Sequence, residues 1–143
     1  FFPNRAVRAT ESAVKESAEN IVHTMGLTHR MHTPASVLSC GELRLLEVAL
    51  ALAAKPEILM LDEPAAGLNS QEARQFGEIL KTLRGTLVQS ILIVEHNMSL
   101  VMGVSDRVVV MHFGEKLIEG TPAQVQADSR VVEAYLGGGG KKA

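Results

Sequence analysis

The stretch of sequence that decides the fold is Ile58-Leu59-Met60-Leu61-Asp62-Glu63-Pro64. Its apolar run is short and lies between Pro56 and the turn-forming residues 64–67, which favours a buried strand of a parallel sheet over a helix. Ligands of open α/β sheets bind just outside the carboxyl ends of the strands. We therefore predict that Asp62 and Glu63 lie where metal–phosphate chemistry is carried out. Taken alone, an acidic pair that merely ends a strand is an equally good interpretation.

Composition limits the class of protein. The chain has 143 residues, about one domain, and its 46% hydrophobic and 21% charged residues are typical of a soluble globular protein rather than a disordered one. The net charge is −2 and the basic residues are scattered, so no nucleic-acid-binding face is expected. No apolar run is long enough to cross a bilayer, and no signal peptide is recognised. The single cysteine, Cys40, excludes an internal disulfide.

Helical and strand patterns alternate along the chain. Helices are predicted over about 10–25, 41–54, 71–83 and 98–104, with a short helix from Pro122 and a last one over 131–135. Buried strands are predicted at 58–62 and 90–95, and a hairpin at 108–111 and 116–119. This order predicts an α/β fold with a mostly parallel sheet, flanking helices and a C-terminal hairpin.

Two interpretations are open for Leu38-Ser39-Cys40-Gly41-Glu42, which precedes the second helix. Ser39 is a good N-cap, and Glu42 three residues later completes a capping box. A serine hydroxyl, a glycine and free N–H groups at the positive end of a helix also form an anion site. The two interpretations are compatible, so this motif alone does not decide between them.

The histidines also have simple structural explanations. His96 follows the second buried strand, and a histidine hydrogen-bonded in a turn is the simpler explanation of that position alone. His23, His29 and His32 lie near one another in sequence, but their spacing does not converge on a metal, so a solvated loop is expected.

Four segments stand in order along the chain, and together they carry a resemblance. They are Leu38-Ser39-Cys40-Gly41-Glu42, Leu61-Asp62-Glu63-Pro64, Ala66-Gly67-Leu68-Asn69 and Val94-Glu95-His96. In this order they resemble the signature motif, Walker B strand, D-loop and switch histidine of the nucleotide-binding subunit of ABC transporters. The C-terminal stretches 119–125 and 132–137 look like the end of the ATPase subunits of branched-chain amino-acid importers.

The resemblance implies a partial P-loop NTPase-like fold with three parts. Residues 1–35 would be a remnant of the helical subdomain, 36–136 the C-terminal half of the nucleotide-binding domain, and 137–143 a flexible tail. No G-x-x-x-x-G-K-[ST] sequence occurs, so the loop that cradles the β- and γ-phosphates is missing. We therefore expect the chain alone not to hydrolyse ATP, and to leave strand edges and apolar surface uncovered.

The same resemblance implies residue roles. Asp62 would hold Mg²⁺ through water, Glu63 would be the general base, and His96 would contact the γ-phosphate of ATP. Ser39 and Gly41 would face the ATP held by an opposite subunit, so that hydrolysis requires a dimer. The nucleotide-binding set is completed by Glu42 and Asn69.

The implied function is an ATP-hydrolysing subunit that energises an importer, with branched-chain, hydrophobic amino acids as substrates. Its partners would be a second nucleotide-binding subunit and membrane permease subunits, and not nucleic acid. It would lie in the cytoplasm, peripheral on the inner face of the plasma membrane. Two alternatives are a soluble ABC-type ATPase acting on DNA or ribosomes, and a non-enzymatic interaction module. The first usually carries long insertions or basic arms, and neither is found here.

Overall fold

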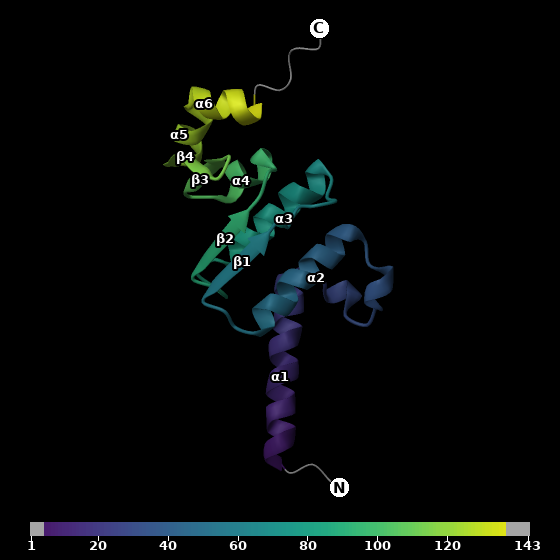
Figure 1. Ribbon diagram of the computed structural model, residues 1–143. Helices are drawn as coiled ribbons and strands as arrows, with labels where there is room; N and C mark the ends of the chain where they lie inside the picture. Colours follow the sequence, from purple (N-terminus) through teal and green to yellow (C-terminus); the bar gives the residue numbers. More distant parts are fainter. Residues whose placement is uncertain (1–4, 137–143) are drawn as a thin grey trace. The chain divides into compact units, whose positions relative to one another are not determined.

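A computed structural model of the chain describes residues 5–136 (Figure 1). The tail at 137–143, expected to be flexible, lies outside the described residues. The chain forms two compact units, Phe1–Glu95 and His96–Ala143, and each is described by itself. The helices and strands of the first unit are α1 (Arg5–Thr24), α2 (Cys40–Ala53), β1 (Ile58–Asp62), α3 (Ser70–Leu83) and β2 (Ser90–Val94). Those of the second are α4 (Met98–Val104), β3 (Val108–His112), β4 (Glu115–Gly120), α5 (Pro122–Ala127) and α6 (Ser129–Val131).

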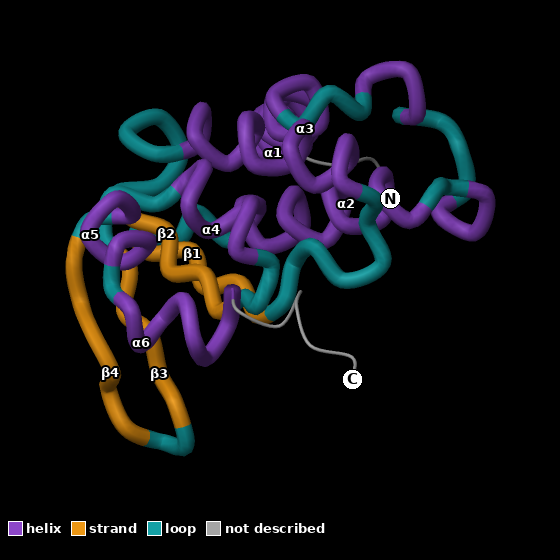
Figure 2. The backbone as a smooth tube through the Cα atoms, turned by 90° about the horizontal axis from the view of Figure 1, so that it is seen from above, coloured by secondary structure: helices purple, strands orange, loops and turns teal. Residues whose placement is uncertain are grey.

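The first unit is built on the parallel pairing of β1 with β2, which confirms the α/β class. Ile58 lies opposite Ser90 and Asp62 opposite Val94, so both strands end at the same edge of the sheet. Figure 2 shows the two strands side by side. The apolar face of α3 is inside, because Phe76 and Leu80 are buried.

One face of the β1–β2 pair is covered and the other is open. Leu59 is buried, whereas the side chains at alternate positions are exposed: Ile58 at 59%, Met60 at 71%, Leu92 at 51% and Val94 at 57%. Successive side chains of a strand point to opposite faces, so these four residues share one face. Among the described residues the sheet of β1 has two strands, and its open apolar face agrees with the expectation of uncovered surface.

The helix ends are set by local signals. α1 begins at Arg5, five residues before the predicted start, because the added residues Arg5-Ala6-Val7-Arg8-Ala9 include strong helix formers. It ends where predicted: Gly26 has φ of 71°, and the Leu27 N–H donates to the Val22 carbonyl at 2.9 Å. The loop after it contains two 3₁₀ turns, Thr28–Arg30 and Ala35–Val37.

The second unit contains the predicted hairpin, β3 antiparallel to β4, as a separate two-stranded sheet. Phe113 and Gly114 form its turn with φ of 47° and 82°, the positive values that a tight two-residue hairpin turn requires. The predicted last helix is divided into α6 and a π-helical turn, Val132–Leu136. The core of the unit is a cluster of buried valines: Val101, Val108, Val110, Val125 and Val131.

Within residues 5–136, none of the helices combines the length and the apolar character needed to cross a membrane.

Candidate functional site

The carboxyl end of β1 presents two adjacent acids. The Glu63 N–H donates to the Val94 carbonyl at 2.8 Å, which extends the parallel ladder by one residue. Glu63 has φ of 45°, in the left-handed region, so the chain turns sharply there. Both Asp62 and Glu63 are exposed, as a site for an incoming phosphate compound requires.

The donor set at this edge suits Mg²⁺. Within the described part of the chain, no three side chains of His, Cys, Asp or Glu gather into a metal site. Mg²⁺ is commonly held by one or two carboxylates together with water and substrate phosphates, rather than by a full protein cage. A single exposed carboxylate such as that of Asp62 is compatible with this mode of binding, and its role toward Mg²⁺ stays a prediction.

The turn after Glu63 is held by a residue that sequence reasoning did not single out. Glu95 follows β2, and its Oε1 atom accepts the N–H of Ala65 at 2.8 Å. Inside the turn, the Ala66 N–H donates to the Glu63 carbonyl at 3.0 Å. From the sequence alone, Glu95 has no role beyond its place in the segment Val94-Glu95-His96. The sequence signal that could have found it is an acid at the end of a strand expected to neighbour β1.

The start of α2 has the predicted capping box. The Ser39 N–H donates to Glu42 Oε2 at 2.8 Å, and the Glu42 N–H donates to Ser39 Oγ at 3.3 Å. The first helical bond runs from the Leu43 N–H to the Ser39 carbonyl, so the Cys40 and Gly41 N–H groups precede the helical ladder. Such N–H groups are the ones an anion binds at a helix N-terminus.

Glu42 is engaged by its own chain on both carboxylate oxygens. Besides accepting from Ser39, it accepts Arg30 Nε on Oε1 at 2.7 Å and lies 3.4 Å from His29 Nε2. The hydrogen bond from Arg30, followed by that from the Ser39 N–H, lowers the pKa of Glu42 from 4.5 to about 2. Arg30 and His29 come from the loop after α1, which sequence reasoning did not connect to the cap. This geometry favours a positioning role for Glu42, and its contact with nucleotide stays a prediction.

The structure brings the start of α2 to the turn after β1. The Ala66 carbonyl accepts Arg44 Nε at 3.3 Å and lies 3.9 Å from Cys40 Sγ. Gly67 has φ of 82°, and a Cβ placed on it would be 3.0 Å from Cys40 Sγ. Within the first unit, three of the predicted segments and the Val94-Glu95 part of the fourth are therefore close together.

Asn69 caps α3. Its Oδ1 atom accepts the N–H groups of Gln71 and Glu72 at 2.9 and 3.0 Å, and its own N–H donates to Glu72 Oε2 at 2.9 Å. Its predicted contact with nucleotide stays a prediction.

His96, the fourth segment's histidine, opens the second unit and is exposed. The next residue, Asn97, caps α4 by accepting the Leu100 N–H at 3.1 Å. The peptide bond that joins His96 to Glu95 connects the two units. The role of His96 toward phosphate stays a prediction.

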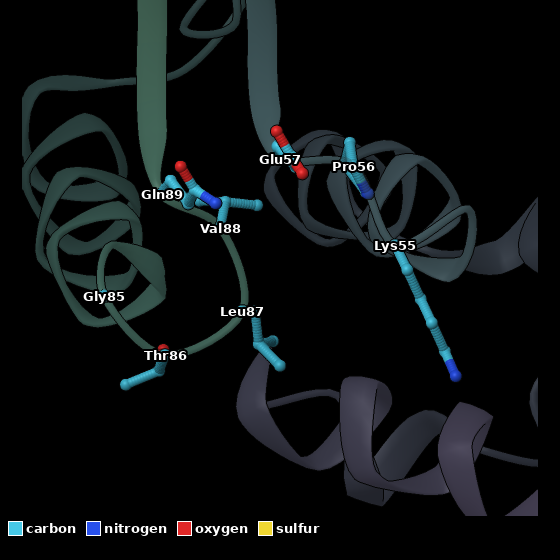
Figure 3. Close-up of a pocket in the computed structure, with 8 residues that line it drawn as sticks. All are labelled: Lys55, Pro56, Glu57, Gly85, Thr86, Leu87, Val88 and Gln89. Atoms are coloured by element: carbon cyan, nitrogen blue, oxygen red, sulfur yellow. The ribbon is translucent and has the colours of Figure 1, made fainter.

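A pocket lies at the opposite end of the strands, away from the predicted site (Figure 3). Lys55 and Glu57 line it from the α2–β1 loop, and residues 85–89 from the α3–β2 loop. The two loops are joined by the Gln89 N–H, which donates to the Glu57 carbonyl at 2.8 Å. In Figure 3 the side chains of Lys55 and Thr86 point apart, so they do not converge on a ligand.

The fold and the site define an α/β domain segment suited to phosphate chemistry at the ends of parallel strands. Residues 1–66 match the family described as ABC transporter, and residues 115–141 match the branched-chain amino acid ATP-binding cassette transporter family. The structure is similar to the ADP conformation of MJ1267, an ATP-binding cassette of an ABC transporter, with a TM-score of 0.79 and 30% identity. That match covers 87% of this chain and 50% of the other, and it confirms the P-loop NTPase-like fold.

Two transport proteins are similar over most of this chain. The branched-chain amino acid transport ATP-binding protein LivG of Salmonella typhimurium is 42% identical over 132 residues, which is 92% of this chain and 52% of LivG. BraF of Pseudomonas aeruginosa, of the same description, is 39% identical over 137 residues, or 96% of this chain and 54% of BraF. The chain belongs to the family of ABC transporter ATP-binding proteins. It spans about half the length of these curated relatives.

Proposed function

We propose that the chain acts as part of an ATP-hydrolysing subunit that energises an ABC importer of branched-chain, hydrophobic amino acids. The observation that carries the proposal is the pair Asp62 and Glu63, which the bond from the Glu63 N–H to the Val94 carbonyl holds at the end of β1. The printed descriptions of LivG and BraF, both branched-chain amino acid transport proteins, support the substrate class.

The residues at this edge would act on ATP by positioning and by charge. Glu63 would orient the attacking water and accept its proton, because its carboxylate is exposed at the strand end. Asp62 would hold Mg²⁺, which when bound neutralises charge on the phosphates. His96 would donate a hydrogen bond to the γ-phosphate.

The start of α2 would bind the nucleotide of a second subunit. The Ser39 hydroxyl accepts the Glu42 N–H and keeps its own proton to donate to a phosphate oxygen. The Cys40 and Gly41 N–H groups precede the helical ladder, where the helix dipole favours an anion. Glu42 would hold Ser39 in place. Asn69 would keep the neighbouring turn in register by capping α3.

We further propose the setting in which this chemistry occurs. Two nucleotide-binding subunits would face each other across two ATP molecules and couple to membrane permease subunits on the cytoplasmic face. The 143 residues contain no G-x-x-x-x-G-K-[ST], so no lysine of that motif neutralises the β- and γ-phosphates. The 143-residue chain alone would therefore not hydrolyse ATP.

The first test uses a longer subunit that carries this sequence together with a phosphate loop. Glu63→Gln removes the base but keeps the size of the side chain, so hydrolysis should fall by about a hundredfold or more while Mg²⁺-ATP binding is kept. Glu115→Gln, on an exposed turn-side residue of β4, is the matched control and should leave the rate unchanged. Equal rates for Glu63→Gln and the parent would refute the assignment of the base.

The second test is calorimetric titration of the 143-residue chain with Mg²⁺ and a non-hydrolysable ATP analogue. We expect no binding, and saturable binding would refute the need for the phosphate loop. Co-purification of the longer subunit with a membrane permease supports the importer, whereas co-purification with nucleic acid would favour a non-transporter ATPase.

A further inference from the structure

Glu95 joins the last residues of β2 to the turn after β1. Its Oε1 atom accepts the Ala65 N–H at 2.8 Å, although the two residues are 30 positions apart in sequence. One residue earlier, the Val94 carbonyl accepts the Glu63 N–H at 2.8 Å. The end of β2 therefore binds the backbone on both sides of Pro64.

The turn after β1 needs a hydrogen bond beyond the regular strand ladder, because it contains Pro64 followed by a buried residue. Pro64 has no N–H, so the parallel ladder cannot continue through it. Ala65 offers the next donor, and that residue is buried, with 7% of its surface exposed. A buried N–H without an acceptor is strongly unfavourable, so the Glu95 carboxylate replaces the ladder acceptor that a regular strand would supply.

The same turn reaches the start of α2. Ala65 is followed by Ala66, whose carbonyl accepts Arg44 Nε at 3.3 Å and lies 3.9 Å from Cys40 Sγ. A shift of the Ala65 peptide would therefore move Glu63 on one side and loosen the contact with α2 on the other. Glu95 is half-buried and lies at one end of this set of contacts.

We propose that Glu95 is a positioning residue for hydrolysis: its carboxylate, through the Ala65 N–H, fixes the turn that orients Glu63. The inference rests on the proposed function of Glu63 as the general base. In this role Glu95 would act through the turn, without itself contacting the attacking water or the phosphate. It acts as a hydrogen-bond acceptor, and the length of its side chain, which brings Oε1 to the Ala65 N–H, matters more than its negative charge.

The test compares three variants of the longer subunit in steady-state ATP hydrolysis. Glu95→Gln keeps an oxygen at the same reach, so its kcat should stay within about threefold of the parent. Glu95→Asp keeps the charge but is one methylene shorter, and Glu95→Ala removes the acceptor. Both should lower kcat about ten- to a hundredfold with little change in KM for ATP, because misplaced catalytic groups slow the chemical step. Glu78→Ala, which removes an exposed acid from α3, is the control.

If the length of the side chain matters, Glu95→Gln should be more active than Glu95→Asp. If the negative charge matters, the order of the two activities should be reversed. Activity of Glu95→Asp above that of Glu95→Gln would overturn the proposal, even where Glu95→Ala does not fold. A raised KM with unchanged kcat would also overturn it, because Glu95 would then serve nucleotide binding.

A second measurement is independent of hydrolysis. Hydrogen–deuterium exchange of the Ala65 amide in the nucleotide-free subunit should be slow in the parent and in Glu95→Gln, and fast in Glu95→Asp and Glu95→Ala. Slow exchange in all four would overturn the proposal. The two proposals can fail separately. If the four chains show this exchange pattern but the parent subunit does not hydrolyse ATP, the proposed function is refuted and the Glu95 contact is still established.

Discussion

The thiol of Cys40, at the start of α2, packs against Gly67 in the turn after β1. A Cβ on Gly67 would lie 3.0 Å from Cys40 Sγ, and Sγ itself is 3.9 Å from the carbonyl of Ala66. A side chain at residue 67 would therefore require the Cys40 thiol to move by a few tenths of an ångström. The size of residue 67 therefore controls how closely the two predicted nucleotide-binding segments approach each other.

The first prediction concerns that contact. Gly67→Ala should destabilise the chain by about 1–2 kcal/mol for the left-handed backbone, and by about 1–3 kcal/mol more for the contact with Cys40. Gly85→Ala is the matched control, because Gly85 has φ of 77° and no atom within 4 Å of an added Cβ. Urea unfolding should therefore show the larger loss at Gly67. In the double variant Cys40→Ala/Gly67→Ala, the extra loss of stability at Gly67 should disappear. If it persists, the contact with Cys40 is not its cause.

A second prediction concerns chemical modification of Cys40. The thiol is exposed, so a maleimide should reach it. The added group must push against Gly67 and the Ala66 carbonyl, and ATP hydrolysis by the longer subunit should fall. Cys40→Ser should be active and insensitive to the reagent. Unchanged activity after complete labelling, measured by mass spectrometry, would contradict this expectation.

The third prediction separates the structural role of Asn69 from any role toward nucleotide. Asn69→Ala removes the acceptor of the Gln71 and Glu72 N–H groups and should cost about 1 kcal/mol of unfolding free energy. Asn69→Asp keeps the cap and should unfold like the parent. A change in ATP hydrolysis by Asn69→Asp at unchanged stability would then report a contact with nucleotide.

The fourth prediction is a pH dependence of stability centred on Glu42. Its pKa in the folded chain is about 2, below the ordinary 4.5, so the unfolded chain binds the proton first as pH falls. The stabilisation is fully present above about pH 4.5 and is lost as the pH falls towards about 2.

Glu42→Gln tests this dependence. Its unfolding free energy should fall less than that of the parent between these pH values, as measured by urea unfolding at pH 7, 4 and 3. Asp128 has a pKa of about 2 because of the hydrogen bond from Arg130, and it contributes equally to both chains. Parallel pH profiles for the two chains would show that the Arg30–Glu42 pair does not stabilise the fold.

Local signals predicted most of the elements. The strand at Ile58–Asp62 and the capping box of Ser39 and Glu42 depend on residues a few positions apart, and each was found. α1 begins earlier than predicted because its first residues, rich in arginine and alanine, favour a helix. The α/β class followed from the order of the elements.

Contacts between distant residues could not be predicted in this way. The bond between Glu95 and Ala65 depends on the register of two strands and on the turn at Pro64, and neither is set by periodicity. The contact of Arg30 with Glu42 likewise requires the loop after α1 to fold back over the start of α2. In both cases a charged side chain satisfies a backbone or carboxyl group that is distant in sequence.

The shared direction of β1 and β2 also has a practical consequence for reporter experiments. The loop at Gly85–Gln89 lies at the amino end of strands about 16 Å long, far from the acids at their carboxyl ends. Leu87 in this loop is 41% exposed, and Cys40 is the sole cysteine of the sequence. A Cys40→Ser chain with Leu87→Cys would therefore accept a fluorophore or spin label at the end of the strands remote from Asp62 and Glu63.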